Sequence, residues 1–168
     1  MRYPYYVEEF GTVPKLLWET VDDTVMGGVS HSAILNKVST MIFTGEVSLE
    51  NNGGFASTRA SIAEELSDQC AGLRIRIRGD GSRYDFRIRV DGRYSRISYR
   101  STFLASGRWA EFWFPWSSFR ATFRGDQLVN IPPPQPDLVR EVGFIIADGQ
   151  QGPFTLEVDW IRAEHGKM

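Results

Sequence analysis

Cysteine and histidine are both scarce in this sequence. The single Cys70 excludes an internal disulfide and gives no sign of an oxidising compartment. With His31 and His165 as the only histidines, the sequence gives little support for a Ser/His/Asp or Cys/His catalytic site. It also lacks the cluster of His and Cys residues that a zinc site needs. A phosphate-binding loop and a dinucleotide fingerprint are absent. We therefore expect a protein without catalytic activity, metal or cofactor.

Long hydrophobic runs are missing as well. The longest wholly apolar stretch near the C-terminus is Phe144–Ala147, which is far too short to span a bilayer. The first ten residues contain no apolar stretch flanked by basic residues, so no signal peptide is visible. These two absences lead us to expect a soluble cytoplasmic protein.

The sequence is rich in aromatic residues and in arginine. Its 168 residues are 42% hydrophobic and 13% aromatic, which suits one globular domain over residues 1–168. Between residues 74 and 100 there are nine arginines and only three aspartates, although the net charge of the whole chain is −2. This segment therefore carries a surplus of six positive charges, and its side chains are candidates for carboxylate or phosphate contacts.

Alternation of apolar and charged residues predicts strands along most of the chain. Between residues 73 and 78, three apolar residues alternate with three arginines, as in a strand with one buried face. Residues 84–90 repeat this alternation, Asp91-Gly92 is a hairpin dipeptide, and residues 97–101 continue a third strand. We predict that these three runs form an antiparallel meander with an arginine-rich outer face.

The remaining elements complete a prediction of the fold class. Further strands are predicted at Thr40–Leu49, Phe55–Ala60, Ala110–Pro115, Val142–Ala147 and Phe154–Ile161. The only helix signal is Ser61-Ile-Ala-Glu64, whose spacing matches a capping box. Many short strands with Gly- and Asp-rich turns predict an all-β fold, a jelly-roll-like antiparallel β-sandwich with one or two short helical turns.

Four strings of turn residues stand out along the chain. In Trp18–Ser30, two aspartates and a glycine pair surround Val25-Met26, and Asn51–Ser57 places two asparagines and two glycines before Phe55. A Thr-Phe-Arg-Gly core lies within Phe119–Gly125, and the fourth string is Gly143–Ile161. Glycine pairs allow positive φ or close backbone approach, and exposed Asn and Asp side chains offer hydrogen bonds.

In this order, the four strings and Arg59 resemble the complex I intermediate-associated protein 30 family over about residues 18–162. The resemblance implies a galactose-binding-like β-sandwich and kinship with assembly factors of respiratory NADH:ubiquinone oxidoreductase, which are not known as catalysts. Mitochondrial relatives act in the matrix and carry extra N-terminal sequence that is not seen here. This difference favours a stand-alone cytoplasmic protein.

These observations favour a non-catalytic binding or assembly module that acts through protein–protein contacts. The resemblance implies a respiratory-complex subunit or an assembly intermediate as the partner. Arginine, tryptophan and tyrosine dominate interface hot spots, so exposed aromatics such as Trp113 or Tyr94 could join arginines of the meander. The predicted partner face consists of Arg74, Arg76, Arg78, Arg87 and Arg89.

Two other ligand classes stay open. The loops of the strings could form a small-ligand pocket, with a sugar as the first candidate by analogy of fold. The candidate ligand- or partner-binding residues in these loops are Asp22, Asp23, Met26, Asn51, Asn52, Phe55 and Arg59. RNA is the second alternative, because Tyr84, Tyr94 and Tyr99 are interleaved with the arginines. The negative net charge of the whole chain argues against it.

Calcium is a weaker alternative for the acidic residues of these strings. Asp22 and Asp23 with Glu50, or Asp159 near the last strand, could supply oxygen ligands. Aspartates that cap turns are more common, so the prediction contains no metal site.

Overall fold

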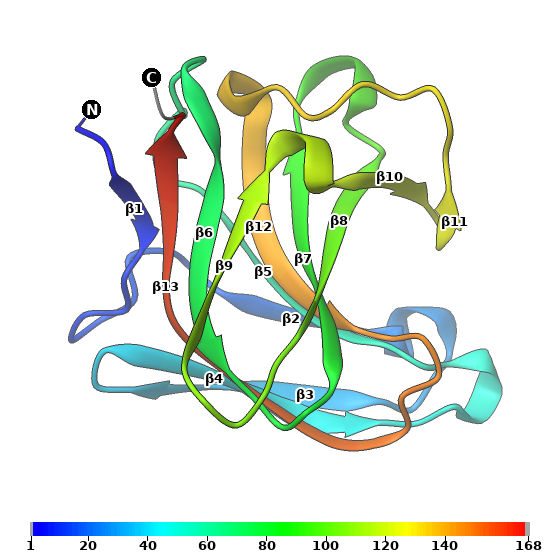
Figure 1. Cartoon of the computed structure of the whole chain (residues 1–168). Helices are drawn as coiled ribbons and strands as arrows, with labels where there is room; N and C mark the ends of the chain where they lie inside the picture. Colours follow the sequence, from blue (N-terminus) through cyan, green and yellow to red (C-terminus); the bar gives the residue numbers. More distant parts are fainter. Residues whose placement is uncertain (1, 167–168) are drawn as a thin grey trace.

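The computed structural model describes residues 2–166, and β-strands form most of it (Figure 1). The strands are β1 (Tyr5–Glu8), β2 (Glu19–Asp22), β3 (His31–Lys37), β4 (Thr40–Val47), β5 (Ala56–Ser61), β6 (Cys70–Arg78), β7 (Arg83–Val90), β8 (Ser98–Leu104), β9 (Ala110–Pro115), β10 (Arg120–Phe123), β11 (Asp126–Gln127), β12 (Val139–Ile146) and β13 (Gly152–His165).

Two antiparallel sheets pack face to face. The six-stranded sheet has the order β3-β4-β13-β6-β9, with β1 also paired to the long strand β13. The seven-stranded sheet has the order β11-β10-β8-β7-β12-β5-β2. Every pairing is antiparallel, so the predicted β-sandwich is confirmed.

The aromatic residues meet between the two sheets. Phe86 of β7 lies 5.4 Å from Phe144 of β12 and 5.2 Å from Phe114 of β9, measured between ring centroids. These three rings come from both sheets and are buried. Their offset and tilted arrangement is the one that aromatic pairs favour. The aromatic excess of the sequence is therefore used to join the two layers.

In residues 2–166, the helical part is limited to short 3₁₀ turns. They are η1 (Asp23–Met26), η2 (Glu50–Asn52), η3 (Gly92–Tyr94), η4 (Trp116–Ser118) and η5 (Pro136–Leu138), more than the one or two turns expected. The helix start predicted at Ser61 is wrong. Ser61 ends β5, and the Ile62 N–H donates to the Arg140 carbonyl oxygen at 2.9 Å, so a tertiary hydrogen bond replaces the cap.

Within residues 2–166, no helix combines the length and apolar character that a membrane crossing requires.

The predicted three-strand meander is also wrong. β7 and β8 pair as a hairpin in the seven-stranded sheet, but β6 belongs to the six-stranded sheet. The turn after β6 carries the chain from one layer to the other, and Gly79 in this turn is so close to Ala105 that a Cβ would lie 2.5 Å from the alanine Cβ. Alternation shows that one face of a strand is buried. It does not show which of two sheets sharing a core contains the strand.

Candidate ligand-binding cleft

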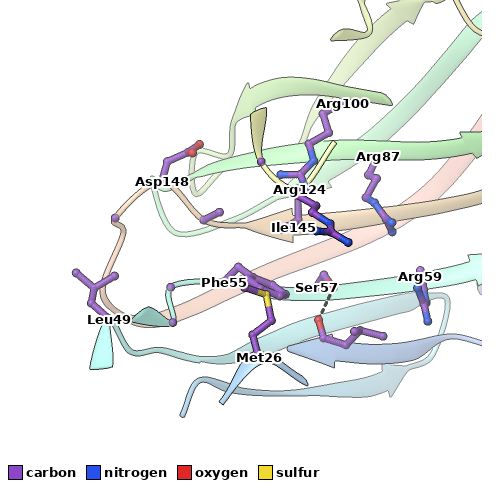
Figure 2. Close-up of a pocket in the computed structure, with 16 residues that line it drawn as sticks. Met26, Leu49, Phe55, Ser57, Arg59, Arg87, Arg100, Arg124, Ile145 and Asp148 are labelled. Atoms are coloured by element: carbon purple, nitrogen blue, oxygen red, sulfur yellow. Dashed lines mark hydrogen bonds between the residues drawn. The ribbon is translucent and has the colours of Figure 1, made fainter. Parts of the chain in front are cut away.

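A cleft of about 750 Å³ lies on the outer face of the seven-stranded sheet (Figure 2). Its floor is formed by outward-facing residues of β2, β5, β12, β7 and β8, and four loops extend around it. Met26 and Phe55 lie on one side, and Arg87, Arg100 and Arg124 lie on the other.

All four sequence strings reach this cleft. The first string supplies Val21 and Met26, and the second supplies Gly53–Phe55 together with Ser57. The third string contributes Arg124-Gly125 from the turn between β10 and β11. The fourth contributes Ile145 and residues 147–149. Segments more than a hundred residues apart in the sequence therefore line the same cleft.

Buried Asp23 joins the first two strings. Its carboxylate accepts hydrogen bonds from the Ser30 N–H at 2.9 Å, the Ser30 hydroxyl at 2.5 Å and the Gly54 N–H at 2.6 Å. The Phe55 N–H donates to the same carboxylate at 3.3 Å. Burial alone would raise the pKa of Asp23, but these hydrogen bonds lower it below its ordinary value. The carboxylate is thus a structural acceptor, and these donors use the oxygens that a calcium ion would need.

The side chain of Asp23 explains why positions 28 and 53 are glycine. A Cβ at Gly28 would lie 2.4 Å from Asp23 Cγ, and a Cβ at Gly53 would lie 2.5 Å from Asp23 Oδ2. Asp22 also has a structural role, since its Oδ1 accepts from the Ser32 hydroxyl at 2.6 Å and from the Ser57 N–H at 3.3 Å. The paired aspartates therefore position the loops of the cleft without lining it.

The predicted loop residues divide into three groups. Met26, Phe55 and Arg59 line the cleft, and Asp22 and Asp23 hold its loops in place. The exposed Asn51 and Asn52 have φ values of 55° and 59°, and neither lines the cleft. Asparagine adopts this left-handed conformation more readily than most residues, so the pair shapes the turn before Phe55.

Four arginines line the cleft, against one aspartate, Asp148. Arg59 forms an ion pair with Glu19 at 2.9 Å, and Arg87 forms one with Glu141 at 3.2 Å. Across residues 2–166, no carboxylate lies within 4.0 Å of the guanidinium of Arg100 or Arg124. The cleft therefore combines an apolar side with a cationic side.

Burial affects two of these guanidinium groups. Burial lowers the pKa of Arg87 to about 10, with Glu141 opposing the shift and neighbouring arginines adding to it. Burial also lowers the pKa of Arg100, against the influence of Asp85 and Asp148. Both groups remain protonated at neutral pH, but they carry their charge where water is partly excluded.

The predicted partner face is divided between opposite sides of the molecule. Arg74, Arg76 and Arg78 lie on β6, where they pair with Glu164, Asp159 and Glu157 at 2.7–2.8 Å. Their guanidinium groups also lie over Trp113 or Trp109, with 4.6–5.1 Å from Cζ to ring centroid. Arg87 and Arg89 lie on β7 of the other sheet, where Arg89 donates to the Ser95 carbonyl oxygen at 2.9 Å. The five arginines therefore do not form one surface.

The aromatic residues of the RNA alternative do not form an exposed platform. Tyr84 and Tyr99 are both 1% exposed and belong to the core, and Tyr94 packs against its edge. Base stacking needs an accessible ring face, which Tyr84 and Tyr99 do not offer. Of the aromatics predicted at an interface, Trp113 is 36% exposed, with Arg74 over its ring.

The two histidines lie away from the cleft. His31 is exposed on β3, and His165 stacks on Tyr3 with 3.9 Å between ring centroids. In the described range 2–166, no group of three or more His, Cys, Asp or Glu side chains is placed to hold a metal ion. Asp159, the alternative residue considered for calcium, pairs with Arg76 on the six-stranded sheet.

Sequence reasoning missed Arg100, Arg124 and Asp148 as cleft residues. Arg124 and Asp148 lie inside two of the four strings, so the signal for them was present. Arg100 belonged to the arginine-rich segment, but its neighbours became visible only through the pairing of β8 with β7 and β10.

Comparison with known families and structures adds to this geometry. The family model described as complex I intermediate-associated protein 30 (CIA30) matches residues 9–158. A family 11 carbohydrate-binding module of a cellulosomal cellulase of Clostridium thermocellum has a TM-score of 0.70 and 15% identity, with 96% of this chain and 94% of that chain covered.

Two other solved structures are complexes with sugars. The family 11 module from Clostridium thermocellum with a β-1,3-1,4-mixed-linked tetrasaccharide has a TM-score of 0.66 and 16% identity, covering 96% of this chain and 95% of that one. A family 29 carbohydrate-binding module with cellulohexaose has a TM-score of 0.57 and 8% identity, covering 96% of this chain and 90% of that one. At these identities the similarity shows a shared fold.

Proposed function

The chain belongs to the complex I intermediate-associated protein 30 family, and from this premise we propose that it is a non-catalytic binding module acting in protein assembly. It would hold a segment of a partner protein in the cleft on the seven-stranded sheet. The family points to a subunit or an assembly intermediate of a respiratory complex as the partner.

The convergence of the four strings is the observation that carries this proposal. Met26, Phe55, Arg124 and Asp148 come from four separate strings and line one cleft. Asp23 fixes two of the loops through four hydrogen bonds, so the cleft exists before any ligand arrives. A preformed site reduces the entropy that binding would otherwise lose.

The chemistry of the lining supports binding over catalysis. General acid–base work needs positioned groups that exchange protons near neutral pH. The described lining offers one carboxylate, Asp148, which is exposed, and four arginines that stay charged. Such groups can neutralise and orient a ligand. They supply no activated nucleophile.

The test is affinity capture from the native host with a cleft-filling variant. Ala147→Trp places a large side chain in the lining without changing any charge. Ala33→Trp makes the same change at an exposed position of β3 in the other sheet. We expect the wild type and Ala33→Trp to retain the same partner, and Ala147→Trp to lose most of it. If the folded Ala147→Trp variant captures the partner as well as the wild type, the cleft is not the binding site.

Carbohydrate binding is the second candidate, favoured by the shared fold and by the position of Phe55 in the cleft. Sugar rings pack on exposed aromatic faces, and Phe55 is the one aromatic residue among the described lining residues. Calorimetry with neutral oligosaccharides would test this candidate. Millimolar ligand without heat of binding would exclude it, whereas binding that Phe55→Ala abolishes would support it.

A further inference from the structure

Three of the four cleft arginines, Arg59, Arg87 and Arg100, lie in one row across the strands, and Arg120 extends this row beyond the cleft lining. Arg87 of β7 is directly opposite Arg100 of β8, and Arg100 is directly opposite Arg120 of β10. On the other side of Arg87, Gly143 of β12 is its partner, and Gly143 in turn is opposite Arg59 of β5. Like charges directly opposite each other destabilise an antiparallel sheet. We therefore expect the row to lower the stability of the sheet.

The carboxylates of the molecule compensate this row only in part. Glu19 and Glu141 pair with Arg59 and Arg87, and Asp85 lies 3.9 Å from Arg120. Asp148 and Asp85 act on Arg100 from a longer distance. Arg100 thus lies between two arginines and forms no ion pair, within 4.0 Å, with any residue between 2 and 166.

Arg100 and Arg124 have guanidinium N–H groups that form no hydrogen bond within residues 2–166 and that a ligand can reach. The Nε atoms of Arg87 and Arg100 both donate to the Ser98 hydroxyl, at 2.8 and 3.3 Å. No other side-chain hydrogen bond of Arg100, and none of Arg124, occurs among the described residues. The same residues contain no buried side-chain nitrogen or oxygen without a partner. The remaining donors of Arg100 are therefore not fully enclosed, and Arg124 is exposed, so an acceptor of a ligand in the cleft can reach both side chains.

Gly143 places no side chain between two arginines of the row. It is buried, it lies between Arg59 and Arg87 in the strand register, and a Cβ at this position would lie 2.3 Å from the Thr58 carbonyl oxygen. Strands lie about 4.8 Å apart, so the Cα atoms of the two arginines are about 10 Å apart.

The opposite side of the cleft is apolar. Met26 is 70% exposed and Leu49 is 42% exposed, and Phe55 and Ile145 lie between them and the arginines (Figure 2). Exposed methionine and leucine beside a preformed cleft are typical of binding surfaces. A ligand that fills the whole cleft must offer an apolar group next to negative charge.

We propose that the cleft binds an acidic segment of a partner protein, whose carboxylates pair with Arg100 and Arg124 while an apolar side chain packs against Met26 and Phe55. This inference rests on the proposed function and specifies its ligand. A neutral sugar would desolvate the guanidiniums without neutralising them. A nucleic acid would supply the negative charge. Single-stranded nucleic acids also stack successive bases on aromatic rings, whereas this lining offers one such ring, Phe55, beside an apolar surface.

The test is selection from random-sequence peptides displayed on phage. Wild-type protein is compared with the double variant Arg100→Gln/Arg124→Gln. The matched control, Arg96→Gln/Arg108→Gln, also removes two positive charges, from exposed residues whose side chains have no hydrogen bond or ion pair within 2–166. Peptides enriched on the wild type over the double variant should carry Asp or Glu beside Leu, Ile, Val or Phe.

The best such peptide, synthesised free, should bind the wild type and the control equally and the double variant about tenfold or more weakly, because hydrogen bonds between charged groups are the strongest. The inference fails if selected peptides lack acidic residues or do not depend on the two arginines. It also fails if polygalacturonate or poly-uridine binds more tightly than any selected peptide. If capture of the native partner depends on Ala147 but not on these arginines, the proposed function stands and only the acidic ligand is wrong.

Discussion

Asp23 shows how a single residue can be essential to a site without touching the ligand. It is fully buried, and its four hydrogen bonds connect the loop before Ser30 with the loop before Phe55. Glycine is needed at positions 28 and 53 because this carboxylate fills the space that a side chain would occupy. A ligand role was predicted for Asp23, but its contacts assign it to the framework of the cleft.

Replacement of Asp23 should therefore lower stability strongly. Asp23→Ala leaves the N–H groups of Ser30 and Gly54 without their acceptor, at an expected cost of about 2–4 kcal/mol in the free energy of unfolding. This corresponds to a fall in melting temperature of about 4–16 °C for a chain of this length. Thermal denaturation followed by circular dichroism measures it. Asp68→Ala, at an exposed position, is the control and should change the melting temperature by less than about 2 °C.

The lowered pKa of Asp23 also gives stability a pH dependence. The lowered pKa values of Glu157 and Glu164, caused by hydrogen bonds and ion pairs that outweigh burial, act in the same direction. The unfolded chain takes up protons first, at about pH 4, so the stabilisation is complete above that pH and is lost as the pH falls through the folded pKa. Urea titrations between about pH 7 and pH 3 should show this loss. In Asp23→Asn the loss should be smaller, and an equal loss would contradict the role of this carboxylate.

Strands β6 and β7 illustrate what a sequence pattern can and cannot predict. Both were predicted correctly as strands with one buried face, because apolar residues alternate with arginines in each. The prediction that both belong to one meander is wrong, because the two sheets share one core and bury the same kind of residue. As a consequence, Arg76 and Arg87 were placed on one face, although they lie on opposite sides of the sandwich.

Arginines of β6 and β8 should respond in opposite ways to the same substitution. Arg76→Gln removes an ion pair with Asp159 and a contact with the Trp109 ring, and should lower stability by about 0.5–1.5 kcal/mol. Arg100→Gln relieves repulsion from Arg87 and Arg120 and should raise stability by about 0.5 kcal/mol. Chemical denaturation of the two variants measures both changes. A clear loss of stability in Arg100→Gln would mean that the arginine row serves the fold.

Across the whole molecule, the β-sandwich was predictable and the cleft was not. The four strings showed which segments matter and placed Met26, Phe55 and Arg59 in the candidate site. The contribution of Arg100 depends on the register of β8 against two other strands, which no local pattern specifies. The cationic side of the cleft is a product of tertiary structure.

The fold is shared with carbohydrate-binding modules, but the charge of the cleft suggests a different ligand. Four arginines on one outer face, next to an exposed Met26, favour an acidic protein segment over a neutral glycan. The outer face of β6, by contrast, has its arginines already paired with carboxylates and stacked on tryptophans. The two faces of the sandwich therefore differ in their readiness to bind an anion.

Backbone amide chemical shifts test the location of the site most directly. The ¹⁵N-labelled protein would be titrated with the partner segment recovered by capture or selection. We expect the largest shift changes at residues 53–55, at Arg87 and Arg100, and at Arg124, with little change along β6 and β9. The cleft is not the binding site if the shift changes are concentrated at Arg74, Arg76 and the neighbouring Trp109 and Trp113 while the amide shifts of the cleft residues stay unchanged.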